Sequence, residues 1–265
     1  ILIGETNTDE LLGDNGDDII DAKSGNDTLS GGAGNDTLTG GDGTDSLTGG
    51  AGNDTYQFNT NDVDAGESIT EAASGGTDTI SVITSTDFAN MSNASFDEIE
   101  VINFGGASQT ATFKGSQLTA ETLVLTETVS GTSNLIVNVG SGTTATFANM
   151  TAGSGFTSGT DTITINGTTG NETITGPNIS STISGGSGND ILTGGTAADI
   201  INGGDGADAL IGGSGDDIYQ FNTNDVDAGE SITETSGSGT DTIVIVTTTD
   251  FTNMSAASFD EIEEI

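Results

Sequence analysis

One apolar residue recurs at every ninth position in two separate blocks of the sequence. Glycines and an aspartate lie between these positions, as in GGAGNDTLT at residues 31–39 and GGSGNDILT at residues 185–193. A helix repeats its apolar positions about every 3.6 residues and a long strand every two, so a period of nine fits neither. It predicts short strands joined by tight turns. The apolar positions are Leu2, Leu11, Ile20, Leu29, Leu38, Leu47 and Tyr56, then Ile165, Ile174, Ile183, Leu192, Ile201, Leu210 and Tyr219.

The nonapeptide divides into a turn and a strand. Its first six residues contain the glycines, which permit positive φ and close backbone approach, and its last three place one apolar side chain inward. Two nonapeptides then make an 18-residue coil, and successive coils stack at about 4.8 Å. Stacking predicts that Asp9, Asp27 and Asp45 line one edge of the roll. Asp18, with the aspartates that follow it at intervals of 18 residues, lines the other edge. The alternative is that these aspartates are turn formers that satisfy local backbone donors.

A second repeat has a period of 163 residues. It maps Tyr56 onto Tyr219, and 37 of the 49 residues in 54–102 are identical to those in 217–265. Both chain ends fall within expected strands. We therefore expect the sequence to be a window from a longer tandem array, whose function depends on repetition.

Composition restricts the chemistry that the chain can perform. It has 41 acidic residues against two basic ones, Lys23 and Lys114, with no histidine or cysteine and a formal charge of -39. It lacks an imidazole base, a thiol nucleophile and the clustered basic residues that bind nucleic acid or anionic membranes. No apolar run approaches the roughly 20 residues of a membrane-spanning helix, so membrane insertion is not expected. The expected partner is a cation, and the chain is not expected to be an enzyme.

The nonapeptides resemble the GGxGxDxUx repeat of the RTX (repeats-in-toxin) family, which binds calcium in a parallel β-roll. Calcium takes six to eight oxygen ligands, and carboxylates and turn carbonyls supply them. Carried over residue by residue, the resemblance implies carboxylate ligands at Asp9, Asp18, Asp27, Asp36, Asp45, Asp54, Asp190, Asp199, Asp208 and Asp217. It implies carbonyl ligands at or near Gly32, Gly34, Gly41, Gly43, Gly50, Gly52, Gly186, Gly188, Gly204 and Gly206.

The second block departs from this pattern at its start. Glu172 stands where aspartate is expected, and Ser181 offers no carboxylate. Whether these two turns bind metal stays open.

Each block is followed by a degenerate continuation, over residues 57–80 and 220–243. The order of glycine, acid and apolar residue persists there, so Glu67, Asp78, Glu230 and Asp241 are further candidate ligands. Ordinary solvated turns are the alternative. Tyr56, Phe58, Tyr219 and Phe221 are expected to form a wider apolar core where the thin roll ends.

The expected fold class is all-β: a parallel β-roll of 18-residue coils alternating with a wider parallel β-solenoid, in an elongated tandem-repeat rod. Short strand-like runs continue through residues 99–166 at 99–104, 110–113, 122–125, 134–139, 144–147 and 161–165, and residues 88–100 are expected to form a helical turn. The expected segments are a roll (1–57), a connection (58–98), a solenoid (99–166), a second roll (167–220) and a second connection (221–265).

Three functions are compatible with these features. The first is a secreted structural protein, such as a surface layer, an extracellular filament or an adhesin stalk, that calcium folds and stiffens outside the cell and that can assemble with copies of itself. The second is the C-terminal secretion and folding segment of an RTX exoenzyme or toxin. The third is ice binding, which uses flat threonine rows; here serine, isoleucine and alanine interrupt the rows.

Overall fold

The computed structural model describes residues 1–71, 75–223, 225–234, 239–254, 259 and 261–264. Almost all of the regular structure is parallel β-strand. The described helical residues are limited to one short α-helix, α1 (Gly115–Leu118), and two 3-10 turns, η1 (Asn93–Ser95) and η2 (Phe251–Asn253). The all-β prediction is therefore confirmed, as is the helical turn expected within residues 88–100.

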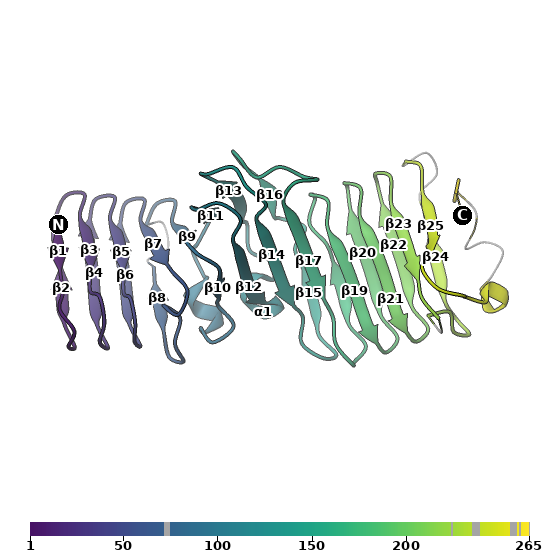
Figure 1. Cartoon of the computed structure of the whole chain (residues 1–265), viewed down its shortest axis with the longest axis horizontal. Coiled ribbons are helices and arrows are strands. Elements are labelled where there is room, and N and C mark those ends of the chain that lie inside the picture. Colours follow the sequence, from purple (N-terminus) through teal and green to yellow (C-terminus); the bar gives the residue numbers. More distant parts are fainter. Residues whose placement is uncertain (72–74, 224, 235–238, 255–258, 260, 265) are drawn as a thin grey trace. The chain divides into compact units, whose positions relative to one another are not determined.

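The chain divides into two compact units. The first contains residues 1–113, 121–135 and 152–161, and the second contains 114–120, 136–151 and 162–265. Figure 1 traces the strands of each unit in chain order. The segment boundaries expected from the sequence remain predictions.

Parallel sheets form the coils of the first unit, and over residues 1–82 successive strands alternate between two of them. One sheet has the order β1 (Leu2–Ile3), β3 (Ile19–Asp21), β5 (Thr37–Thr39), β7 (Thr55–Phe58), β9 (Thr79–Val82), β11 (Val101–Phe104) and β13 (Val124–Glu127). The other contains β2 (Glu10–Leu12), β4 (Thr28–Ala33), β6 (Ser46–Ala51) and β8 (Ser68–Thr70), and further along β10 (Thr86–Asp87) pairs with β12 (Thr110–Lys114).

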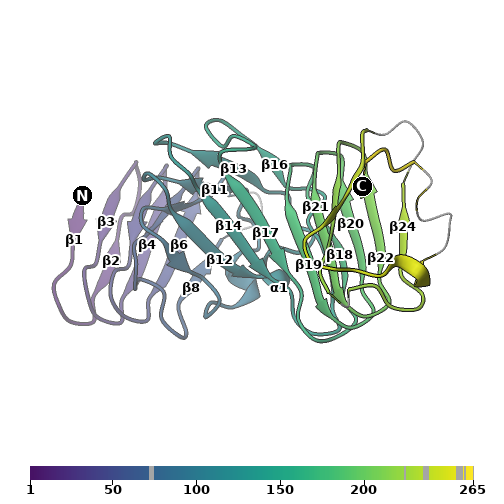
Figure 2. The ribbon, with the colours of Figure 1, turned by 45° about the vertical axis from the view of Figure 1, so that its right-hand side comes forward.

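The second unit repeats the arrangement. One sheet runs through β17 (Thr162–Asn166), β19 (Thr182–Ser187), β21 (Ile200–Asp205), β23 (Ile218–Phe221) and β25 (Thr242–Ile245). The other runs through β15 (Thr144–Thr146), β18 (Thr173–Thr175), β20 (Ile191–Gly195), β22 (Ala209–Gly213) and β24 (Ser231–Thr233), as Figure 2 shows in part. The remaining strands are β14 (Asn134–Asn138) and β16 (Thr151–Ala152).

Strand register confirms the 18-residue coil. Leu29 pairs with Leu47 in β6, and Ile183 pairs with Ile201 in β21. After each block the coil lengthens: Leu47 pairs with Ile69, and Tyr56 pairs with Ile80. The parallel solenoid predicted to follow the nonapeptides is therefore present, with more residues in each coil.

The core of each roll is one apolar side chain thick on each sheet. Leu29, Leu38, Leu47 and Ile20 are each 0% exposed, and the threonine and serine residues beside them are only partly buried. Burying each such side chain contributes about 1.5–3 kcal/mol. A thin core of this kind leaves much of the roll's stability to its turns.

Aromatic side chains widen the core after the first block. Tyr56 and Phe58 are buried, and the Phe58 ring meets Phe88 edge-on at 5.2 Å between ring centroids. Phe88 stacks on Phe113 at 4.6 Å, and Phe96 packs edge-on against Phe113 at 5.4 Å. In the second unit Phe221 meets Phe251 at 5.3 Å. The expected apolar core at the end of each roll is confirmed.

Candidate metal centres

The aspartates predicted as ligands stand in ladders that run along the turns of each roll. After the first member of each ladder, one carboxylate oxygen of each aspartate accepts a hydrogen bond from the backbone N–H of the residue one coil earlier: Asp36 Oδ1 accepts from Asp18 N, and Asp54 Oδ1 from Asp36 N, both at 2.7 Å. The first roll has the ladders Asp9, Asp27, Asp45, Glu67 and Asp18, Asp36, Asp54, Asp78, Glu100. The second has Glu172, Asp190, Asp208, Glu230 and Ser181, Asp199, Asp217, Asp241, Glu263.

Glycine at the start of each turn makes room for the second carboxylate oxygen. A Cβ on Gly31 would collide with Oδ2 of Asp36, and a Cβ on Gly185 would collide with Oδ2 of Asp190. The side chain of the aspartate thus folds back over the first glycine of its own turn. The spacing between that glycine and its aspartate therefore has a steric cause.

The ten glycines expected to supply carbonyls all adopt positive φ, between 96° and 138°. This backbone conformation suits glycine and lets the coils approach closely. The Gly34 carbonyl oxygen lies against the Cα of Gly52 one coil later, and the Gly188 oxygen lies in the same way against Gly206. Carbonyls and carboxylates therefore occupy the same turns, although which carbonyls bind metal stays a prediction.

The second carboxylate oxygens are buried, and they have no hydrogen-bond partner among the described residues. They belong to Asp27, Asp36, Asp45, Asp54, Glu67, Asp190, Asp199, Asp208, Asp217 and Glu230. A buried polar atom without a partner is costly, and a buried charge is more so unless an opposite charge pairs with it. A hard cation that takes oxygen ligands meets this requirement, so the residues present fit calcium.

The comparison with known families agrees with this geometry. The family model described as the RTX calcium-binding nonapeptide repeat (4 copies) matches residues 1–29, 21–56 and 184–219. These blocks are RTX repeats. Residues 1–56 and 184–219 therefore carry calcium-binding repeats of RTX type. No curated protein and no solved structure matches it. Among the residues that the structure describes, no helix is long and apolar enough to cross a membrane.

Burial in the RTX rolls opposes ionisation of the carboxylates. It raises the pKa of Asp45 and Asp217 to about 6 and that of Asp199 to about 7, although hydrogen bonds to each carboxylate partly offset the effect. It raises the pKa of Glu67 and Glu230 to about 8. Two charges one coil apart, at about 4.8 Å, repel by about 3 kcal/mol at an effective dielectric of about 20. A cation between the coils reverses the sign of this interaction.

The acids of the degenerate continuation extend the RTX ladders. Glu67, Asp78, Glu230 and Asp241 are between 1% and 3% exposed, so they do not lie in solvated turns. Glu67 Oε2 accepts from Asp45 N at 2.8 Å, and Asp78 Oδ1 accepts from Asp54 N at 2.8 Å. Their metal binding stays a prediction.

The first turns of the second RTX block differ chemically from the rest. Glu172 uses both carboxylate oxygens for backbone donors, Gly142 N at 2.6 Å and Thr168 N at 3.1 Å. Ser181 Oγ donates to Asp199 Oδ1 at 2.9 Å. Neither turn therefore presents the free carboxylate oxygen found in the regular turns.

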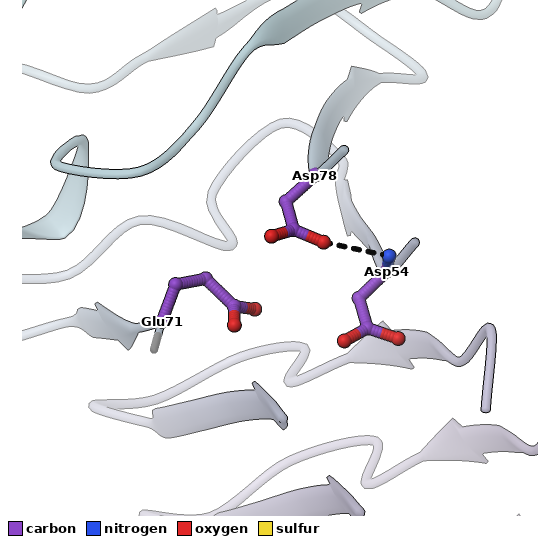
Figure 3. Close-up of side chains that lie close together, drawn as sticks. All are labelled: Asp54, Glu71 and Asp78. Atoms are coloured by element: carbon purple, nitrogen blue, oxygen red, sulfur yellow. Dashed lines mark hydrogen bonds between the residues drawn. The ribbon is translucent and has the colours of Figure 1, made fainter. Parts of the chain in front are cut away.

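Four acidic residues of this region were missed by sequence reasoning. Glu100 and Glu263 extend the ladders, since each accepts the backbone N–H of the aspartate before it. Glu71 and Glu234 form compact groups with two ladder aspartates each: Asp54, Glu71 and Asp78 in one copy (Figure 3), and Asp217, Glu234 and Asp241 in the other. Their recurrence at a separation of 163 residues was the available signal.

Proposed function

We propose that the chain is a secreted, calcium-binding structural segment, of a surface layer, an extracellular filament or an adhesin stalk, which folds and stiffens when it meets external calcium. The observation that carries this proposal is the set of buried carboxylate oxygens that have no hydrogen-bond partner. They occur at successive turns of both rolls, so the rolls are built around cations along their length.

Calcium acts here as a folding switch because the sites exist only in the folded chain. Without the ion, buried carboxylates one coil apart repel one another and resist ionisation at neutral pH. Binding to the folded state alone adds its free energy to folding. Calcium-poor cytosol would keep the rolls unfolded for export, and calcium-rich surroundings would fold them.

A structural role is supported by the repetition of parts that have no catalytic pattern. Both copies of the 163-residue unit repeat the carboxylate ladders, and the sequence has no histidine or cysteine. We therefore propose that the chain is not an enzyme and that its partners, besides calcium, are copies of itself. A secretion segment of an exoenzyme needs the ladders but gives no reason for a near-identical second unit.

Far-UV circular dichroism during a calcium titration from excess chelator tests this proposal, with magnesium as the control ion. We expect a cooperative transition from coil to β-structure that is specific to calcium. A chain with as much β-structure in chelator at neutral pH as in calcium would contradict the proposal, because the ladders would then be ordinary turn chemistry.

A pair of variants links the transition to the ladder. Asp36→Asn keeps an oxygen that can accept the Asp18 N–H but loses the carboxylate, so we expect the calcium midpoint to rise by about tenfold. Asp42→Asn removes the same charge from an exposed position outside the ladders and should leave the midpoint unchanged. Equal shifts in the two variants would mean that net charge, and not the ladder, controls folding.

A further inference from the structure

The turn that closes each RTX block carries a glutamate where the regular coils carry glycine. Thr48 pairs with Thr70, so the following residues, Gly49 and Glu71, lie in adjacent coils at the same position. In the second copy Ile211 pairs with Thr233, which places Glu234 beside Gly212 in the same way. A glutamate at the position of the first glycine therefore occurs in this coil in both copies.

Three carboxylates meet at this turn. One oxygen from each of Asp54, Glu71 and Asp78 lies within 4.8 Å of the others, and the same holds for Asp217, Glu234 and Asp241. Figure 3 shows the carboxylate groups of the first copy facing a common space. Asp54 and Asp78 belong to the ladder, so Glu71 is the added group.

A buried, unpartnered oxygen points into this group. Asp54 is 1% exposed and its Oδ2 has no hydrogen-bond partner. A Cβ on Gly49 would meet that Oδ2, Glu71 Oε1 and the Tyr56 hydroxyl, so these three atoms surround one point. Asp217, which is 0% exposed, directs its unpartnered Oδ2 toward the corresponding point beside Gly212.

The tyrosine hydroxyl positions the added carboxylate. Tyr56 Oη accepts from Gly49 N at 2.6 Å and donates to Glu71 Oε1, and Tyr219 donates to Glu234 Oε1. A carboxylate oxygen retains acceptor capacity beside one such bond, so it can also bind a metal. Glu71 Oε2 also accepts from Gly50 N at 3.4 Å, so hydrogen bonds orient the carboxylate while its oxygens keep acceptor capacity for a cation.

We propose that Glu71 and Glu234 turn the closing turn of each roll into a three-carboxylate site for a hard cation, with calcium as its ion. The proposal rests on the calcium-binding function proposed above and adds a kind of site that the nonapeptide pattern does not contain. Because ligand charge sets the affinity of calcium sites, this site binds more tightly than a regular turn and favours ions of higher charge.

The two tyrosines make the site observable. The chain has two tyrosines and no tryptophan, and both tyrosines lie at the proposed sites. Terbium is a trivalent hard cation, and it emits when a nearby excited tyrosine transfers energy to it. Excitation of the full chain at limiting terbium should therefore give strong emission, which added calcium displaces.

The variant Glu71→Gln with Glu234→Gln tests the assignment. It should lower this emission at least tenfold, while the control Asp64→Asn with Asp227→Asn removes the same charge from exposed positions in the same coils and should keep it. Emission and calcium displacement equal to those of the parent chain would overturn the proposal.

Folding and binding are separated by circular dichroism in saturating calcium, which should be the same for the variants and the parent chain. If the double variant does not fold, Glu71→Gln alone decides, because the intact second copy should then retain about half of the emission; undiminished emission would overturn the proposal. A parent chain that neither folds with calcium nor sensitises terbium would remove the proposed function itself. Calcium-induced folding combined with emission that does not depend on Glu71 would remove this inference alone.

Discussion

The RTX coils and the wider coils that follow them fill the space between their parallel strands in different ways. Both are stacks of parallel strands, but a roll coil has a thin core of single aliphatic side chains such as Leu38, and the wider coils contain the Phe88, Phe96 and Phe113 cluster. The roll buries carboxylates instead of aromatic rings. From this difference we expect the roll to need its ions for stability and the wider coils, with their apolar core, to need none.

The buried acids of the two regions also differ, in whether the protein binds one or both of their carboxylate oxygens. Among the wider coils, Glu127 accepts from the Ser133 hydroxyl at 2.7 Å and from Gly131 N at 3.3 Å, and Asp161 accepts from Ser133 N and Thr157 N. Both oxygens of each acid are thus bound by the protein. In the rolls eight ladder aspartates, from Asp27 to Asp54 and from Asp190 to Asp217, each have one buried oxygen without a partner among the described residues, which is left for a cation.

Removing calcium should produce the largest difference between the RTX coils and the wider coils. In excess chelator we expect backbone amides of β4 to β7 to lose protection from hydrogen exchange by at least a thousandfold, about 4 kcal/mol. Amides of β11 and β13 should lose much less, because their core is aromatic. Mass spectrometry of exchanged peptides, with and without calcium, measures both regions in one sample. Equal loss in both regions would show that the wider coils have no stability of their own.

Core truncations should separate the regions in a second way. Phe88→Ala removes the ring that contacts Phe58, Phe96 and Phe113, and it should cost about 3–5 kcal/mol with or without calcium. Leu38→Ala should cost about 2–5 kcal/mol, but only in calcium, because the roll is unfolded without it. Denaturant titrations in both conditions test this. A Phe88→Ala effect confined to calcium-loaded protein would mean that the metal also controls the aromatic core.

The nine-residue period predicted the roll well because one spacing sets strand register, glycine placement and the aspartate ladders. It gives no register where the coil lengthens, and there the candidates Glu67 and Asp78 came from the order of glycine, acid and apolar residue instead. Glu67 and Asp78 lie 22 and 24 residues after their ladder partners Asp45 and Asp54, and no fixed spacing predicts such values. Glu71 was missed for a related reason: it occupies a glycine position, so its carboxylate joins Asp54 only once the register is known.

The short elements of the wider region were also beyond sequence reasoning. Strands β10 and β16 have two residues each, and α1 has four. Such lengths carry no periodic signal. Their position depends on packing against neighbouring coils, which the longer spacing of this region does not specify.

Acidic pH should have two effects on the rolls. It should stabilise their metal-free fold, and it should weaken calcium binding. Burial raises the pKa of Glu67 to about 8 from an ordinary value of 4.5, so the metal-free fold binds more protons than the unfolded chain between these values. The contribution of Glu67 to the stability of the metal-free fold is full below about pH 4.5 and is lost as the pH rises through about 8. Circular dichroism in chelator should therefore show more β-structure at pH 5 than at pH 8.

Calcium competes with these protons. The calcium midpoint should rise as pH falls from 8 to 6, by about tenfold per unit for each proton that binding releases. Glu67→Gln with Glu230→Gln should flatten this dependence, since both glutamates have a pKa raised to about 8. An unchanged slope in this variant would assign the released protons to other groups.

The smallest expected effect comes from filling the gap at the start of the second roll. Ser181 occupies a ladder position and donates to Asp199, which has its second oxygen buried without a partner. Ser181→Asp adds the missing carboxylate one coil before Asp199. In calcium it should lower the calcium midpoint of the second roll by about threefold, less than 1 kcal/mol, because one turn among several gains a ligand.

In chelator the same variant should destabilise any residual fold, because it replaces a hydrogen bond to Asp199 with a like charge. The sign of the effect should therefore reverse with the metal, and a stabilisation that is the same with and without calcium would mean that the ladders do not act through cations at this edge.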